Sequence, residues 1–284
     1  MRRQIMDNLF TDISYRTSRL VTSAYSTSFS MGVRCLHPSI RNAIYSIYGF
    51  VRIADEIVDT FHEYNKEKLL TDFERAYYEA IDEGISLNPI LNSFQKTVKS
   101  YNISDELVQA FLKSMKSDLY KTKFSETEIK EYIYGSADVV GLMCLKVFVN
   151  GNEAQYEKLK PYAMRLGSAF QKINFLRDLK HDSTDLHRTY FPVLKTEPFN
   201  EHTKNIILND VSEDFRIALI GIRQLPGNAR LGVYTAFLYY KSLTKRIKQV
   251  QAEQIMKERI SVPNYLKILL LCKAYTNTKW NGIW

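Results

Sequence analysis

The sequence predicts an all-α protein built from long helices. Of its 284 residues, 45% are hydrophobic, which is enough for a sizeable core, whereas glycine (11) and proline (7) are scarce. No segment shows the alternation of apolar and polar residues, bounded by turn residues, that is typical of strands. We found no repeat or linker, so we expect one domain over residues 1–284, with an irregular loop only at 182–200.

The segment after Pro38 carries the clearest helical pattern. Apolar residues recur at steps of three and four, which predicts an amphipathic helix that begins near Pro38; they are Ile40, Ile44, Ile47, Val51, Ala54 and Val58. A second stripe, one residue further round, holds Tyr48, Arg52, Asp55 and Asp59. The two carboxylates therefore lie on the flank of the buried face, where they can line a cleft.

The segment 160–182 repeats this arrangement. Its apolar stripe consists of Tyr162 or Ala163, Leu166, Phe170 and Ile173. One residue round lie Gly167, Gln171, Asn174, Asp178 and Asp182, so a helix through Asp182 again ends in two aspartates one turn apart. A basic residue accompanies each pair, Arg52 in the first helix and Arg177 in the second.

Paired carboxylates in an apolar setting suggest a divalent cation. Side chains four apart on a helix are neighbours, and two like charges there repel one another. Mg²⁺ relieves this repulsion, because it prefers oxygen ligands and binds one or two carboxylates together with substrate phosphates. Two facing pairs would hold Mg²⁺ and a diphosphate. The alternative is a solvated helix face, which we expect for the third such pair, Asp210 and Asp214, in charge-rich DVSED.

The net charge of +8 and a pI near 9.2 favour anionic partners. Nucleic acid is not expected, because the basic residues are dispersed and no recognition module is present. The densest cluster, KSLTKRIK at 241–248, is read as a solvated helix face. Phosphorylated small molecules and an anionic membrane surface remain as candidate partners.

The three cysteines, Cys35, Cys144 and Cys272, form no CxxC pair and are odd in number. They predict neither a zinc site nor a disulfide framework, and they fit a reducing compartment. The N-terminus lacks the apolar segment of a secretory signal, and no run of eighteen apolar residues exists. We therefore expect a cytoplasmic protein.

Several stretches together resemble the squalene/phytoene synthase family of head-to-head prenyl synthases, most of all its bacterial phytoene synthases. These stretches occur in the family's order and nearly span the chain: YSTSFS (25–30), NAIYSIYGFVRIADEIVD (42–59), YIYGSADVVGLM (132–143), LGSAFQKINFLRDLKHD (166–182), RTYFP (188–192) and ERISVPN (258–264). Two departures stand out. Asp138 occupies a common glycine position, and Lys180 and His181 make the second signature more basic.

The resemblance implies a single-domain, isoprenoid-synthase-type helical bundle around a central cavity. It also implies that Mg²⁺, or Mn²⁺ in its place, is bound by Asp55, Asp59, Asn174, Asp178 and Asp182, of which the four aspartates are the catalytic residues. Arg52 and Arg177 would contact diphosphate. The substrate channel would be lined by Ser26, Ser28, Phe29, Tyr48, Gln171 and Tyr239. The alternatives are helix-end hydrogen bonding for the serines and core packing for Phe29 and Tyr239.

The reaction implied is the condensation of two prenyl diphosphates through a cyclopropylcarbinyl diphosphate. Overall similarity favours phytoene synthesis from two C20 geranylgeranyl diphosphates, in carotenoid biosynthesis and without NADPH. A C30 synthase making squalene or dehydrosqualene from farnesyl diphosphate is the alternative within the family. The alternatives outside the family are a non-catalytic assembly factor, a membrane-surface binding protein and a metal phosphohydrolase. The last is disfavoured because the histidines form no ligand set. A water-insoluble product implies peripheral contact with membrane lipid and a downstream desaturase.

Overall fold

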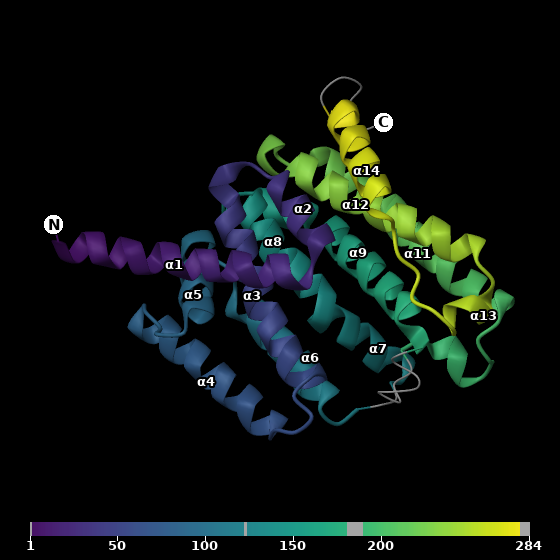
Figure 1. The fold of residues 1–284 in the computed structure, drawn as a ribbon, viewed down its shortest axis with the longest axis horizontal. Helices are drawn as coiled ribbons and strands as arrows, with labels where there is room; N and C mark the ends of the chain where they lie inside the picture. The colour runs from purple at the N-terminus through teal and green to yellow at the C-terminus, as the bar shows by residue number, and fades with distance from the viewer. Residues whose placement is uncertain (1, 122–123, 181–189, 279–284) are drawn as a thin grey trace.

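The computed structural model describes residues 2–121, 124–180 and 190–278, and from residue 9 onward it includes their side chains. Throughout these ranges the regular elements are helices, and no strand is present, which confirms the all-α prediction. Figure 1 shows the helices gathered into one bundle, from which the N-terminal part of α1 (Arg2–Tyr25) extends. None of the described helices is both long and apolar enough to cross a lipid bilayer.

Helices α2 (Thr27–Arg34) and α3 (Pro38–Asp59) follow α1 with short connections. The Ser26 side chain accepts the Phe29 backbone N–H at the start of α2, and His37 caps α3, with Pro38 in its first turn. The apolar stripe predicted for α3 is buried, apart from a partly exposed Val51. The helix thus begins at Pro38, as predicted, and ends at Asp59, the last residue of the polar stripe.

Three helices form a layer beside α3, namely α4 (Lys66–Glu83), α5 (Pro89–Tyr101) and α6 (Asp105–Asp118). Asn65 and Asn88 cap the first two, and α4 ends at Gly84 with a φ of 73°. Phe50 of α3 stacks on Phe94 of α5 at a centroid distance of 4.0 Å, which joins this layer to the core.

The middle of the bundle is an almost continuous helical path. It comprises α7 (Glu126–Ile133), a π-helical turn η1 (Tyr134–Asp138), α8 (Val139–Phe148) and α9 (Glu153–Arg177). Helix α8 is apolar on nearly all sides and is mostly buried, as expected for a helix at the centre of a bundle. The prediction that α9 runs unbroken through residue 182 was wrong, because the helix ends at Arg177 and Asp178 is its C-cap residue.

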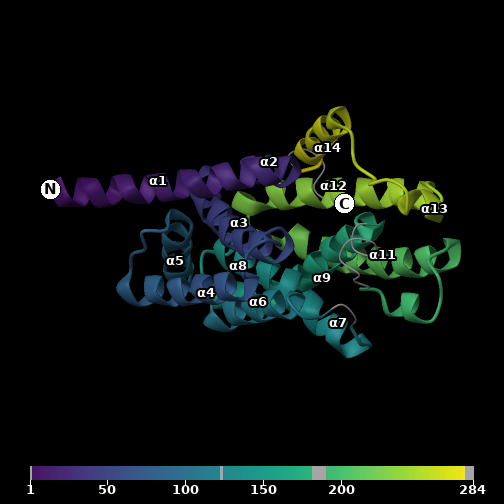
Figure 2. The same ribbon diagram turned by 60° about the horizontal axis from the view of Figure 1, so that its bottom comes forward.

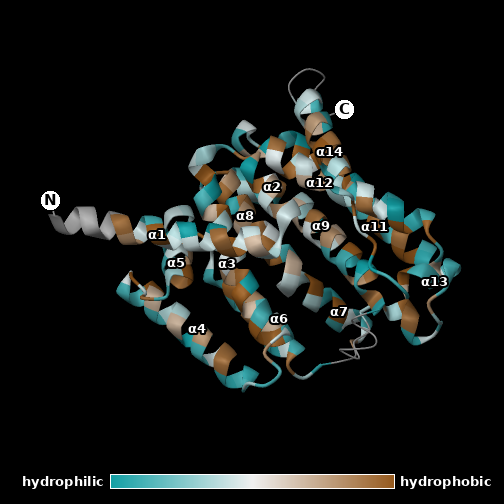
Figure 3. Ribbon diagram, viewed as in Figure 1, coloured by the Kyte–Doolittle hydropathy of each residue, from teal (hydrophilic) through white to brown (hydrophobic). Residues whose placement is uncertain are grey.

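A short 3₁₀ turn, η2 (Pro192–Lys195), precedes α11 (Glu201–Gln224), α12 (Gly227–Gln249), α13 (Ala252–Ile255) and α14 (Asn264–Thr276). In Figure 2, α1, α2, α12 and α14 occupy one side of the molecule, and α14 lies outermost on it. One cluster of buried apolar side chains extends from Val33 to Ala274. Apolar residues also occur along α14, at the outside of the bundle (Figure 3).

Candidate active site

A cavity of about 290 Å³ lies at the centre of the bundle, between α2, α3, α8, α9, α11 and α12. Most of its lining is aliphatic or aromatic, including Ile47, Phe148, Leu166 and Phe170. Its polar side chains are few, and they are Tyr48, Ser136, Tyr162, Gln171, Asn174 and Tyr240. The cavity can therefore hold a long apolar chain and exclude water from it.

The carboxylates begin where the cavity lining ends on α3 and α9. Val51 is the last lining residue of α3, and Asp55 follows one turn later. Asn174 is the last lining residue of α9, and Asp178 follows it by the same spacing. Tyr48 interacts electrostatically with both Asp55 and Tyr240, and Tyr240 in turn with Asp178. The two helix ends thus bring charge to one end of an apolar cavity.

Arg52 organises the charge on α3. Its guanidinium donates to the carboxylates of Asp55 and Glu56 and lies 4.3 Å over the ring of Tyr25. Burial lowers its pKa, but the two acidic partners outweigh this effect and raise it overall. The Arg52 Nε is buried and has no hydrogen-bond partner in the described part of the chain. This donor is suited to an anionic oxygen of a substrate.

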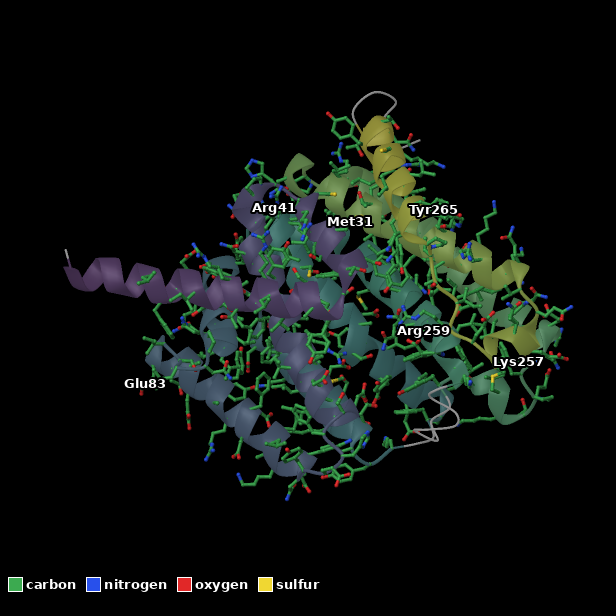
Figure 4. The ribbon with its side chains drawn as sticks, in the orientation of Figure 1. Met31, Arg41, Glu83, Lys257, Arg259 and Tyr265 are labelled. Atoms are coloured by element: carbon green, nitrogen blue, oxygen red, sulfur yellow. The ribbon has the colours of Figure 1, made fainter. Side chains whose placement is uncertain are left out.

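Asp178 is held by two arginines at the end of α9. Arg177 donates from Nη2 at 2.5 Å and from Nε at 3.0 Å, and Arg259 Nε donates at 2.7 Å. Burial raises the pKa of Asp178, but the two guanidinium groups outweigh burial and lower it, so the carboxylate stays ionised. Figure 4 shows Arg259 on the segment before α14.

Arg259 was missed as a site residue by the sequence analysis. It lies in ERISVPN, a stretch noted only for its resemblance to a late family segment. Its place in that stretch was the one sign in the sequence that Arg259 could belong to the site. Its distance along the chain gave no such sign, because 81 residues separate Arg259 from the carboxylate that it contacts. Spacing patterns detect partners within one helix but not across such a separation.

An amide and a tyrosine connect the cavity to the charged end. The Tyr240 hydroxyl donates to Asn174 Oδ1 at 3.1 Å, and its ring stacks on Phe170 at 3.9 Å. Tyr240, rather than the predicted Tyr239, lines the cavity. Tyr239 is the next residue on the helix, and the Lys267 ammonium lies 5.8 Å from its ring. One residue is a rotation of about 100°, which is enough to move a side chain out of the cavity wall.

The serines and aromatic residues of the N-terminal signature divide between two roles. Phe29 lines the cavity and stacks on Tyr48 at 4.7 Å, so it is more than core filling. Ser26 caps α2 and also bonds the Tyr48 hydroxyl, whose pKa is raised to about 12, mainly by burial. Ser28 does not line the cavity.

Of the other predicted residues, Gln171 lines the cavity and its Nε2 donates to Ser136 Oγ of η1 at 3.4 Å. Asp59 is the last residue of α3, beside Val58, whose carbonyl accepts from Lys66 Nζ at 2.7 Å. Asp182 and His181 lie outside the described residues.

The prediction that Asp210 and Asp214 are surface residues was wrong for Asp214. Asp210 is 59% exposed, but the side chain of Asp214 is only 1% exposed. Arg165 donates to Asp214 at 2.9 Å and Lys172 at 2.6 Å, both from α9. A buried carboxylate requires such partners, so this pair belongs to the α9–α11 interface.

Asp138, which occupies a position where the family commonly has glycine, lies beside the cavity and not in its wall. The residue is 6% exposed, and its carboxylate accepts a hydrogen bond from Ser168 Oγ at 2.8 Å. Burial raises the pKa of Asp138 to about 7, chiefly because a charge there is poorly solvated. The extra carboxylate therefore faces α9, and the neighbouring Ala137 lines the cavity instead.

The donor set suits Mg²⁺. Asp55, Asp59, Asn174 and Asp178 offer only oxygen atoms or an amide, which are the ligands that this ion prefers. Within residues 9–121, 124–180 and 190–278, no group of three or more histidine, cysteine, aspartate or glutamate side chains converges on one point. One or two carboxylates at each helix end match an ion that completes its shell with water and substrate phosphate.

Comparison with known proteins gives consistent results. Residues 22–200 match the squalene/phytoene synthase family. The chain is 28% identical to a 15-cis-phytoene synthase of Synechocystis, over 92% of this chain and 84% of that protein. It is 25% identical to a phytoene synthase of Arthrospira platensis, over 91% of each.

Solved structures share the fold. A dehydrosqualene synthase in complex with a ligand superposes with a TM-score of 0.79, at 17% identity, over 95% of this chain and 98% of that one. A squalene synthase from Alicyclobacillus acidocaldarius gives a TM-score of 0.73, at 18% identity, over 84% and 94%. From the extent of the sequence match, this chain belongs to the squalene/phytoene synthase family.

Proposed function

We propose that the protein is a phytoene synthase-like prenyltransferase that condenses two geranylgeranyl diphosphates head to head. The observation that carries the proposal is the similarity to named phytoene synthases over 91–92% of the chain. An apolar cavity that ends at two carboxylate–arginine clusters supports it, because such a substrate has a long apolar chain and an anionic head.

The two arginine clusters would bind the diphosphates. Arg52 offers an unpaired Nε, and Arg177 and Arg259 converge from two segments on Asp178. Asp55, Asp59, Asn174, Asp178 and Asp182 are the proposed ligands of Mg²⁺, which when bound neutralises diphosphate and makes it a better leaving group. The arginines that now pair with carboxylates are then free to bind phosphate oxygens.

The cavity wall would stabilise the carbocations. Loss of one diphosphate leaves an allylic cation, and the double bond of the second substrate attacks it with loss of a proton. The resulting cyclopropylcarbinyl diphosphate ionises, rearranges and loses a second proton. Two diphosphates and two protons leave, so no reductant is needed. The faces of Phe29, Tyr48, Phe170 and Tyr240 offer negative potential to these cations in a water-poor space.

A C30 product is the second candidate, favoured by the ligand-bound dehydrosqualene synthase as a structural neighbour. At 17% identity that likeness concerns the fold, so it gives the C30 activity less support than the sequence relatives give the C40 activity. A non-catalytic assembly factor has no use for carboxylates gathered beside a cavity. Incubation of pure protein with C15 or C20 diphosphate, followed by chromatography of the hydrocarbon, decides between them. We expect phytoene from C20 diphosphate without NADPH, and a C30 product alone would overturn the proposal.

Metal dependence is tested in the same assay. We expect turnover to require Mg²⁺ or Mn²⁺ and to disappear in excess EDTA, because the anionic leaving group is then neutralised by arginine alone. Restoration by Mg²⁺ is the control for chelator damage. Full turnover in EDTA would contradict the assignment of the carboxylates as metal ligands.

The product would pass from the cavity into lipid. Each CH₂ costs about 0.8 kcal/mol to expose to water, so a C40 hydrocarbon does not leave through solvent. We therefore include peripheral membrane contact in the proposal, and a membrane-associated desaturase as the consumer of the product.

A further inference from the structure

Helix α14 turns an apolar face outward. Tyr265, Ile268, Leu269 and Cys272 follow one another at steps of three, one and three, so they share one side of the helix. The first three are 67%, 60% and 58% exposed, and Cys272 is exposed as well. The side of α14 that faces the bundle buries only Ala274 fully. Leu266 and Leu270 pack against the core beside Ala274, so α14 is apolar on its outer side as well as on its inner side, whereas an ordinary surface helix turns polar residues outward.

The two helices that contact α14, like α14 itself, carry positive charge and no acidic residue. Helix α14 has two basic residues, α12 has five and α2 has one, and none of the three contains aspartate or glutamate. Acidic residues make up 31 of the 284, about one in nine, so their absence from three neighbouring helices is a marked asymmetry. A second copy of the same surface would repel it, whereas an anionic surface would attract it.

Two of these helices, α2 and α12, form part of the cavity wall and also contact α14. Lys267 Nζ of α14 donates to Thr27 Oγ1 of α2 at 3.4 Å and lies near the Tyr239 ring of α12. Helix α2 supplies Gly32 and Val33 to the cavity, and α12 supplies Gly232 and Val233. Helices α2 and α12 therefore lie between α14 and the cavity that they line, on the side of the molecule where Figure 2 shows α14.

We propose that the outer face of α14, Tyr265, Ile268, Leu269 and Cys272, inserts into the interface of an anionic lipid bilayer. Three basic residues of the neighbouring helix α12, Lys241, Lys245 and Lys248, are exposed and would contact the lipid headgroups. The aliphatic side chains enter the boundary of the acyl region, where a tyrosine can keep its hydroxyl in the headgroups. Only the purpose of this contact, the delivery of a hydrocarbon, rests on the proposed function.

Vesicle binding tests the proposal directly. The full-length protein is sedimented with vesicles of equal parts phosphatidylglycerol and phosphatidylcholine, and with vesicles of phosphatidylcholine alone. We expect binding to the anionic vesicles that weakens several-fold between about 0.1 M and about 0.5 M salt. The variant I268S/L269S should lose at least about tenfold in binding, because two exposed aliphatic groups no longer enter the bilayer.

A matched control is available on another part of the surface. Leu87 is 91% exposed and Ile85 is also exposed, in the loop between α4 and α5. The variant I85S/L87S removes the same number of exposed aliphatic residues and should bind vesicles as the native protein does. Equal losses in both variants, or no loss in I268S/L269S, would overturn the assignment to α14.

Cys272 provides a second measurement. An environment-sensitive dye on Cys272, in a Cys35→Ser background, should shift its emission to shorter wavelength when anionic vesicles are added. Labelling of Cys144 is disfavoured because burial raises its thiol pKa to about 12. An unchanged emission, or self-association of the free protein that I268S/L269S abolishes, would overturn the proposal in favour of a protein contact.

The enzymatic assay separates this proposal from the proposed function. With substrate supplied in detergent, I268S/L269S should turn over as the native protein does, because α14 supplies no residue to the cavity. Loss of turnover in that assay would contradict a role confined to docking. A native protein that binds vesicles but converts no prenyl diphosphate would refute the proposed function and leave the docking surface in place.

Discussion

Asp178 and Asp214 each come from a pair of aspartates four residues apart, but they have different surroundings in the fold. Both are paired with two basic side chains, Asp178 with Arg177 and Arg259 and Asp214 with Arg165 and Lys172. Asp214 is sealed between α9 and α11, whereas Asp178 follows the last cavity-lining residue of α9 and its side chain is 25% exposed. Ion pairing to two basic residues therefore does not distinguish the two aspartates, and we propose adjacency to the cavity as the criterion that does.

The largest effect is expected at the site aspartates. Asp55→Asn or Asp178→Asn should lower turnover by about 10²–10³-fold, since loss of a metal-binding charge removes several kcal/mol of stabilisation of the departing diphosphate. Each amide keeps a hydrogen-bond acceptor, so the melting temperature should change by only a few degrees. Steady-state kinetics and a thermal melt check this, and a folded variant with native turnover would contradict the site.

Asp214→Asn should instead act on stability. Removing the charge leaves Lys172 and Arg165 without a buried partner, and breaking such a pair costs about 3 kcal/mol. Urea unfolding measures the change in the free energy of unfolding. Turnover per folded molecule should fall less than about tenfold, because Asp214 lies outside the cavity lining. A stable but inactive variant would show that Asp214 acts in turnover, as we expect of Asp178, and not in stability.

The raised pKa of Asp138 predicts that the stability of the protein depends on pH. Its folded pKa of about 7 exceeds the value of about 3.9 in an unfolded chain, so the native state retains a proton that the unfolded state has lost. Stability from this group is fully present below about pH 4 and decreases as pH rises to about 7, by at most about 1.4 kcal/mol per pH unit.

The matched variant for this effect is Asp138→Asn, which can still accept from Ser168 Oγ. The difference in unfolding free energy between native protein and variant should shift in favour of the variant from pH 5 to pH 7. Parallel pH curves for the two proteins would show that Asp138 does not titrate in this range.

The smallest effect is expected at Asp210. It pairs with Lys172 at 2.5 Å, but it is largely exposed, and exposed ion pairs contribute about 0–1 kcal/mol. Asp210→Asn should change turnover less than about twofold and stability by less than about 1 kcal/mol, in the assays used above. If Asp210→Asn matched Asp55→Asn and Asp178→Asn in lost turnover, adjacency to the cavity would not be the criterion.

Local periodicity was sufficient for much of the fold. The stripe from Ile40 to Val58 predicted the position and the buried face of α3, and the stripe along α9 predicted that Gln171 and Asn174 share a side. The C-terminal limit of α9 was not predicted, because residues 174–182 keep a helical pattern past the residue that ends the helix.

Contacts between distant segments could not be predicted from spacing. Arg259 reaches Asp178 across 81 residues, and Asp214 is buried because α9 supplies two cations to it. The difference between Tyr239 and Tyr240 as cavity residue depends on the rotation of α12, which tertiary packing sets. Charge-rich composition suggested a surface for Asp214, and only the neighbouring helix changes that conclusion.

The glycines that line the cavity limit how mutation can change its size. Gly32, Gly141, Gly167, Gly221 and Gly232 all line it. A Cβ at Gly221 would lie 2.2 Å from Tyr162 Cβ, and one at Gly232 would lie 2.4 Å from Leu36 Cδ2 and 2.8 Å from the Gly32 carbonyl oxygen.

A methyl group at Gly221 or Gly232 therefore cannot simply occupy empty space. It must displace Tyr162 or Leu36, which are themselves wall residues, or separate two helices. The volume open to substrate is thus set by helix spacing as well as by the side chains that face the substrate. We therefore expect a single alanine substitution at either glycine to change the shape of the cavity while it leaves every charged residue of the proposed site unchanged.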